Sequence, residues 1–124
     1  MTEYQKENLF LREMQIKYSN MEYTLPDKYQ EKNDAYTKAF NAGHSFIVGY
    51  DTFISRTHAQ NGSIIIGDNV TIGNHCTIDY SGSLIIENNV VISDGVKIYS
   101  HAHDIYNFTH KLPNNVIPSI TTMA

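Results

Sequence analysis

A six-residue period, which begins at Val48 and continues to His103, constrains the fold of this chain more than any other feature. Nine consecutive units can be aligned, with Leu84 and Ile85 as extra residues before the seventh unit. The first position is aliphatic in eight of the nine units: Val48, Ile54, Gln60, Ile66, Ile72, Ile78, Ile86, Ile92 and Ile98. An α-helix repeats every ~3.6 residues and a half-buried strand about every two, so neither explains this register.

A repeat of this kind is typical of short strands joined by tight turns. Three strands make one triangular coil of about eighteen residues, and the coils stack with their strands parallel. The period places three coils at residues 48–65, 66–85 and 86–103, so Ile66 is expected beside Ile86 and Ile72 beside Ile92. The sequence therefore predicts a mainly β fold, a parallel β-helix of about three coils over residues 46–103. A small antiparallel β-sandwich is the alternative.

Residues 1–45 differ from the repeat, and for them the sequence predicts a short α-helical N-terminal arm. Apolar residues at helical spacing indicate a first helix with one buried face: Leu9, Leu11, Met14 and Tyr18. Pro26 suits the first turn of a second helix, and Gly43 suits a stop after it. The residues of this second helix that are expected to face a partner are Tyr29, Ala35, Tyr36, Ala39 and Phe40.

Charge and cysteine content exclude several functional classes. Charged residues make up 18% of the chain, the net charge is −4 and the basic residues are scattered, so no positive stripe is available for a nucleic-acid backbone. No run approaches the length of a membrane span, and the N-terminus lacks a secretory signal pattern. The single cysteine, Cys76, occupies a small-residue position and is expected to pack rather than react. A cytoplasmic setting is the expectation.

The period stops at Asp104, where an aliphatic residue is required. Residues 104–124 are therefore expected to form a catalytic-type loop followed by an irregular tail, because loops that leave a rigid scaffold often carry function. Val116, Ile117 and Ile120 could form one strand, but the tail is not expected to resume the period.

The stretch IIIGDNVTIGNHCTIDYSGSLIIENNVVISDGVKIYSHAHD resembles the hexapeptide-repeat acetyltransferases. It is most similar to the branch that contains maltose and galactoside O-acetyltransferases and relatives acting on cell-surface polysaccharides. The resemblance covers about residues 46–110 and implies a left-handed parallel β-helix. It also implies transfer of an acetyl group from acetyl-CoA to a sugar hydroxyl, in a homotrimer with active sites between subunits.

The resemblance assigns the general base to a histidine. His103 falls on the family's catalytic histidine, which removes the proton from the acceptor hydroxyl before that oxygen attacks the thioester. A neutral imidazole suits this task near pH 7. His101 could point to the same side of the strand and is the second catalytic candidate, ranked below His103 on spacing alone.

Five further residues are candidates for binding the acceptor sugar. Tyr99 and Ser100 precede the two histidines and could line the acceptor pocket. His75 stands where sugar-acetylating members usually carry Asn. Asp79 lies one residue before the acidic position of that branch, and Tyr80 occupies that position.

Two alternatives remain beside the acetyltransferase hypothesis. Members of the family continue with further coils that form much of the acetyl-CoA channel, so the chain resembles a C-terminally truncated member. A scaffold with an incomplete cofactor site, whose open coil end would need a cover, is therefore the first alternative. The second is a β-helix carbonic anhydrase, in which His101, His103 and His75 would bind zinc. We expect no metal, because the spacing fits the acetyltransferases better.

Overall fold

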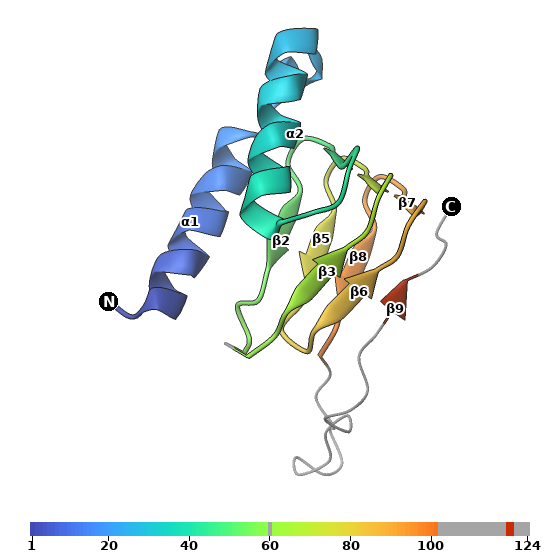
Figure 1. Cartoon of the computed structure of the whole chain (residues 1–124). Helices are drawn as coiled ribbons and strands as arrows, with labels where there is room; N and C mark the ends of the chain where they lie inside the picture. Colours follow the sequence, from blue (N-terminus) through green and yellow to red (C-terminus); the bar gives the residue numbers. More distant parts are fainter. Residues whose placement is uncertain (60, 102–118, 121–124) are drawn as a thin grey trace.

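The computed structural model describes residues 1–59, 61–101 and 119–120, and in these it places two α-helices before nine short strands (Figure 1). Helix α1 spans Glu3–Lys17, a 3₁₀ helix η1 spans Met21–Thr24, and helix α2 spans Pro26–Phe40. The side chain of Thr2 caps α1 by accepting a hydrogen bond from the Gln5 backbone N–H. The predicted helical arm is therefore confirmed, including the start of its second helix at Pro26.

The strands in the described residues form three small parallel sheets. Their bounds are β1 Ile47–Val48, β2 Phe53–Ser55, β3 Ile64–Ile66, β4 Thr71–Ile72, β5 Thr77–Asp79, β6 Leu84–Ile86, β7 Val91–Ile92, β8 Lys97–Tyr99 and β9 Ser119–Ile120. The sheet orders are β1-β4-β7, β2-β5-β8 and β3-β6-β9, so the chain visits the three sheets in turn, three times. All these pairs are parallel, which contradicts the antiparallel sandwich.

The aliphatic first positions pair in register from turn to turn and fill the core. Ile66 lies beside Ile86, and Ile72 lies beside Ile92, as the period predicts. The first-position side chains that are buried are Val48, Ile54, Ile66, Ile72, Ile78, Ile86 and Ile92. Cys76 is buried beneath Thr52, whose hydroxyl accepts a hydrogen bond from the Cys76 backbone N–H at 3.2 Å. Cys76 is thus a packing residue within this stack.

The phase of the three turns differs from the sequence prediction. The period predicts a third unit that starts at Gln60 and a second turn that starts at Ile66. In the structure the third strand is β3, Ile64–Ile66, so Ile66 ends the first turn instead of beginning the second. The tail differs too, because Ser119 and Ile120 form β9 and pair with Ile85 and Ile86 of β6. Residues 119–120 therefore add a strand to the third sheet. The sequence allowed one strand that includes Ile120 but predicted no return to the period.

The helical arm covers the first turn of strands (Figure 1). The two polar groups of the Val48 backbone are satisfied by α2: its N–H donates to Asn33 Oδ1 at 3.0 Å, and its carbonyl accepts from the Lys32 ammonium. The Tyr36 hydroxyl donates to the Thr52 carbonyl at 2.9 Å. Burial lowers the pKa of Lys32 to about 8. An uncovered strand edge invites pairing with another chain, and the arm prevents this at the first turn.

Two of the three corners, here called the tight corners, use connectors of four residues throughout. One consists of residues 49–52, 73–76 and 93–96, and the other of residues 67–70 and 87–90. At the latter, Asn88 Oδ1 accepts a hydrogen bond from the Asp68 backbone N–H of the previous turn at 2.7 Å. A Cβ atom on Gly67 would lie 2.3 Å from that same oxygen. Each turn thus docks an Asp or Asn side-chain oxygen onto the turn before it, and Gly67 leaves room for that oxygen.

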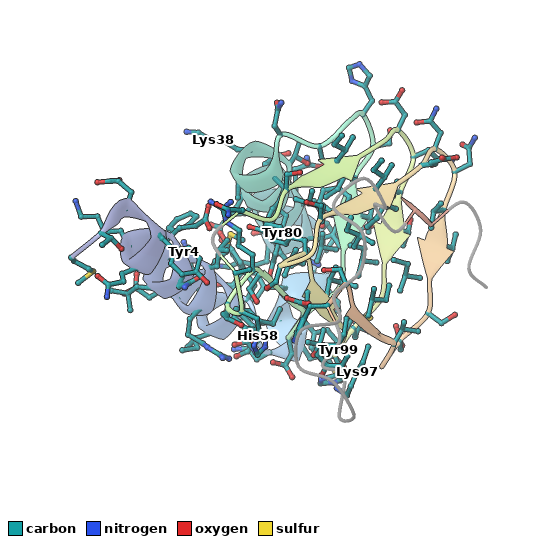
Figure 2. All side chains as sticks on the ribbon, turned by 90° about the horizontal axis from the view of Figure 1, so that it is seen from below. Tyr4, Lys38, His58, Tyr80, Lys97 and Tyr99 are labelled. Carbon is teal, nitrogen blue, oxygen red and sulfur yellow. The ribbon has the colours of Figure 1, made fainter. Side chains whose placement is uncertain are left out.

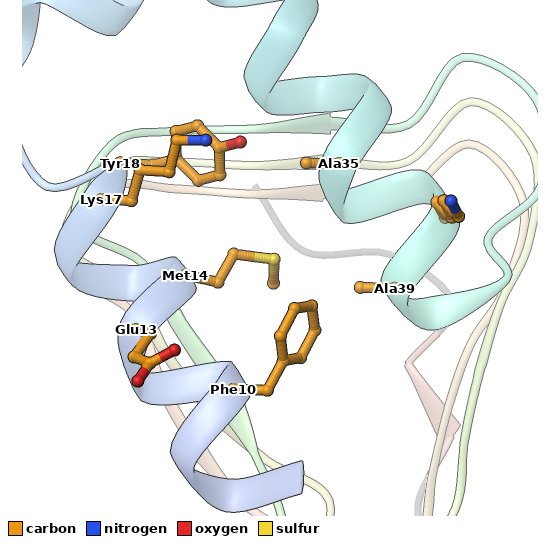
Figure 3. Close-up of a pocket in the computed structure, with 8 residues that line it drawn as sticks. Phe10, Glu13, Met14, Lys17, Tyr18, Ala35 and Ala39 are labelled. Carbon is orange, nitrogen blue, oxygen red and sulfur yellow. The ribbon is translucent and has the colours of Figure 1, made fainter. Parts of the chain in front are cut away.

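A hollow of about 490 Å³ separates α1 from α2 (Figure 3). Phe10 and Met14 of α1 point toward Ala35 and Ala39 of α2, whose short side chains leave the space unfilled. Lys17 and Lys38 also line the hollow. The sequence predicts Ala35 and Ala39 on the partner-facing side of the second helix, and the structure places them there. Within the described residues, no helix is long and apolar enough to cross a membrane.

Candidate functional site

The third corner, here called the wide corner, joins the β2-β5-β8 sheet to the β3-β6-β9 sheet. Its connectors are residues 56–63, 80–83 and 100–118, so both the first and the third exceed the four residues of the tight corners. Extra chain at one end of a rigid stack is where functional residues are expected. Most of the predicted site residues that the structure describes lie here.

Asp79, at the end of β5, is the centre of the wide corner. Asp79 is buried, with only 3% of its surface exposed. One carboxylate oxygen accepts from the Ser81 backbone N–H at 3.1 Å and from the Ser81 hydroxyl at 2.5 Å. The other accepts from the Ser100 backbone N–H at 3.2 Å and from His101 Nδ1 at 2.5 Å. Asp79 therefore ties the second turn to the start of the third connector.

The protonation of this pair follows from the surroundings of Asp79. Burial alone would raise the pKa of the carboxyl group, but the hydrogen bonds from Ser81 and His101 outweigh it and lower the pKa. Asp79 is thus ionised at neutral pH and can only accept hydrogen bonds, which assigns a proton to Nδ1 of His101. In the neutral imidazole, Nε2 is then the nitrogen that can accept a proton.

Two aromatic rings flank His101. The His58 ring, from the first connector, lies with its centroid 4.1 Å from that of His101 and is tilted by 32°. The Tyr99 ring meets His101 edge-on with the centroids 6.3 Å apart, and Tyr99 is 58% exposed. Figure 2 shows His58 and Tyr99 at the same end of the molecule. The wide corner therefore presents a cluster of rings around one buried carboxylate.

Helix α1 holds the first connector in place. Arg56 makes two hydrogen bonds with the Glu7 carboxylate, at 2.6 and 3.0 Å, and a third with the Gly62 carbonyl at 2.7 Å. The Tyr4 hydroxyl donates to the Arg56 carbonyl at 2.7 Å. Bidentate arginine–carboxylate pairs fix orientation as well as position. The connector that carries His58 is thus anchored to the N-terminal arm.

The predicted site residues do not all come together. Asp79, Tyr99, Ser100 and His101 meet at the wide corner. Tyr80 belongs to the second connector of this corner, but its ring is buried and meets Phe40 edge-on, and burial raises its pKa to about 12. His75 occupies a tight corner at the opposite end of β5, where its Nδ1 lies 2.7 Å from Asp51 Oδ2. His103 lies outside the described residues.

The sequence did not indicate the contacts that His58 and Ser81 make at the wide corner. His58 is an exposed turn residue, and its ring faces that of His101 with the centroids 4.1 Å apart, while its backbone N–H donates to the Ser81 hydroxyl at 3.0 Å. Ser81 in turn donates to Asp79. The only signal in the sequence was that the first connector and the third meet at the same corner, and this depends on the phase of the strands.

Neither a group of metal ligands among the described residues nor a similar known protein identifies the function further. Among the residues described here, no three histidine, cysteine, aspartate or glutamate side chains are grouped to hold a metal ion. The zinc alternative requires His103, which lies outside them. Comparisons of the chain with protein-family models, with curated proteins and with solved structures found no match.

Proposed function

We propose that this protein is an acyl-CoA-dependent O-acetyltransferase that acts on a sugar or polysaccharide hydroxyl, with a histidine of the wide corner as general base. The fold proposed for it is a left-handed parallel β-helix of the hexapeptide-repeat type. Two observations support this: the sequence resembles that acetyltransferase family, and its chain visits three parallel sheets in turn. The single observation that carries the chemistry is the hydrogen bond between Asp79 and His101.

The pair can perform the proton transfers of acyl transfer. With Nδ1–H held by the Asp79 carboxylate, Nε2 of His101 accepts the proton of the sugar hydroxyl as its oxygen attacks the thioester carbonyl of acetyl-CoA. The ionised Asp79 stabilises the imidazolium that forms. The imidazolium then returns the proton to the departing CoA sulfur, and the products are the acetyl ester and free CoA.

The geometry favours His101 as the base because it has an orienting carboxylate among the described residues. Nucleophile-activating bases are characteristically held by a third group in this way. The resemblance assigns the role to His103 instead, and that prediction stands beside this one. The two histidines are close in sequence, so one mutant series separates them.

We also propose a homotrimer with its sites between subunits. An exposed apolar side chain on the outer face of the β3-β6-β9 sheet supports an interface, because Ile65 is 59% exposed. Ile85, which lies beside Ile65 in the sheet, extends this apolar face. Apolar residues grouped on an outer strand face are more typical of interfaces than of free surface.

Thiol release from acetyl-CoA with a panel of sugars tests the proposal. We expect His101→Ala to lower turnover by about 10²–10⁴-fold, the usual contribution of a positioned general base. Asp79→Asn is expected to lower it by a similar factor, since the amide can no longer hold the required tautomer. His103→Ala decides the alternative assignment, because a loss confined to His103→Ala gives that residue the role of base.

His44→Ala is the matched control, because His44 is an exposed histidine of the segment between α2 and β1, and turnover of this variant should be unchanged. A chelator should also have no effect. Absence of both turnover and acetyl-CoA binding in the wild-type protein would overturn the proposal in favour of a scaffold without a complete donor site. Loss of activity on chelation would favour the zinc alternative.

A further inference from the structure

The ring of His58, from the first turn, contacts the ring of the proposed base, His101. The two imidazole rings face each other with their centroids 4.1 Å apart and their planes tilted by 32°, although the residues come from the first and third connectors of the wide corner. The hydrogen bond between Asp79 and Nδ1 fixes one atom of the His101 ring. The His58 ring lies against one face of His101, so it also limits how far the His101 ring can tilt.

The placement of His58 is itself determined by three contacts. Its backbone N–H donates to the Ser81 hydroxyl, which donates to Asp79, so His58 and His101 are tied to the same carboxylate. On the other side, Arg56 is held by Glu7 of α1. Gly62 closes the connector against the second turn, where a Cβ atom would lie 2.0 Å from the Tyr80 carbonyl oxygen. These contacts hold the described parts of the connector, residues 56–59 and 61–63, against the second turn and α1.

We infer that His58 is a positioning residue for His101, and that docking of α1 onto Arg56 sets its position. This inference rests on the proposed function for its kinetic consequence. A general base transfers a proton efficiently only when it is held within about 0.5 Å and 10–20° of the productive geometry. The helical arm thus has a role at the site, in addition to covering the first turn.

Nuclear magnetic resonance of the full-length protein, labelled at histidine, tests the placement without any substrate. The His101 ring signals are identified by their absence in His101→Ala. Because the His58 ring current shifts the facing protons upfield, we expect these signals to move downfield in His58→Ala. They should keep most of their shift in His58→Phe, which retains a flat ring. Arg56→Gln should give a smaller change in the direction of His58→Ala, and His44→Ala should give none.

Steady-state kinetics tests the consequence. We expect His58→Ala to lower kcat by about 10-fold with KM for acetyl-CoA unchanged, and His58→Phe to restore kcat to within about 3-fold of wild type, because misplacement of a catalytic group lowers rate without removing binding. Loss of kcat in both variants alike would overturn positioning by stacking.

The two measurements separate the inference from the proposed function. If the protein transfers no acetyl groups, the proposed function fails while the His101 signals still decide the placement of His58. If these signals are the same in His58→Ala and wild type, the inference is overturned whatever the activity. If they move while kcat stays at the wild-type value, the positioning role is overturned and the proposed function survives.

Discussion

The tight corners and the wide corner close the same turns, but different contacts hold them. At the tight corners an Asn or Asp oxygen of one turn accepts a backbone N–H of the previous turn, as Asp94 does from Asn74 at 2.8 Å. At the wide corner the corresponding contacts converge on one buried carboxylate, Asp79. The tight corners repeat a single contact along the stack, whereas the wide corner builds one network that differs from turn to turn.

The difference shows how a repeat accommodates a site. A tight corner must keep its length, because every connector docks onto its neighbour with no space left between them. The wide corner receives connectors of different length, since the chain can bulge outward there and return to the next sheet. Extra residues at that corner bring side chains of the first and third connectors against the second, which is how His58 meets His101.

The largest expected effect comes from changing connector length. Insertion of Gly-Ser between Asn88 and Asn89 of a tight corner should lower the free energy of unfolding by more than about 3 kcal/mol, because the docked amide and the register of β7 are both lost. The same insertion after Ala59 of the wide corner should cost only a few tenths of a kcal/mol, the entropy of a slightly longer loop. Urea unfolding of the two variants measures the contrast, and equal losses would contradict it.

A single methyl group should affect stability differently in two successive turns of one tight corner. A Cβ atom on Gly73 would lie 2.3 Å from Asp94 Oδ1, so Gly73→Ala should cost about 2–3 kcal/mol through overpacking and a disturbed hydrogen bond. Ser93 holds the equivalent position in the next turn and already carries a side chain. Ser93→Ala is therefore the matched control, with an expected change within about 0.5 kcal/mol. Thermal unfolding of both variants gives the comparison.

The wide corner should depend on pH through Asp79. Its folded-state pKa is lowered from the ordinary value of about 3.8, so its stabilising contribution is present above that pH and is lost as the pH falls through the folded pKa. Asp79→Asn should cost about 2 kcal/mol at pH 7, the scale of hydrogen bonds to a charged group, and the difference from wild type should shrink below about pH 4. A constant difference down to pH 2 would contradict the ionised carboxylate.

The smallest effects sharpen the comparison at single hydrogen bonds. Asn74 Oδ1 accepts the partly buried Tyr50 backbone N–H at a tight corner, and Asn74→Ala should cost about 1 kcal/mol. Ser83 Oγ accepts the exposed Ser63 N–H at the wide corner. Its loss in Ser83→Ala should cost about 0.5 kcal/mol or less, because water replaces the acceptor. Denaturant midpoints resolve the order, and a reversed order would contradict the ranking.

The sequence by itself determined the helices, the aliphatic rows and the tight corners. Pro26 begins a helix because its fixed φ suits a first turn, and Ile66, Ile72, Ile86 and Ile92 are inward because the period is local and steric. The same repeat predicts the tight turns that join the strands. The role of Cys76 as a small packing residue also followed from its position in the repeat. Each of these depends on neighbours within a few residues or on the position one turn away.

Tertiary structure alone decided the phase of the first turn, the return of the tail as β9 and the contacts at the wide corner. No local feature of the sequence shows whether the residues from Gln60 form an extra repeat unit or a loop insertion. The free-energy cost of a longer loop is small, and the pairing of Ile66 with Ile86 outweighs it. Asp79 and His101 are 22 residues apart, and His58 and Ser81 are 23 apart. Such residues meet only after the turns have stacked, so their hydrogen bonds depend on a corner whose connectors share no period.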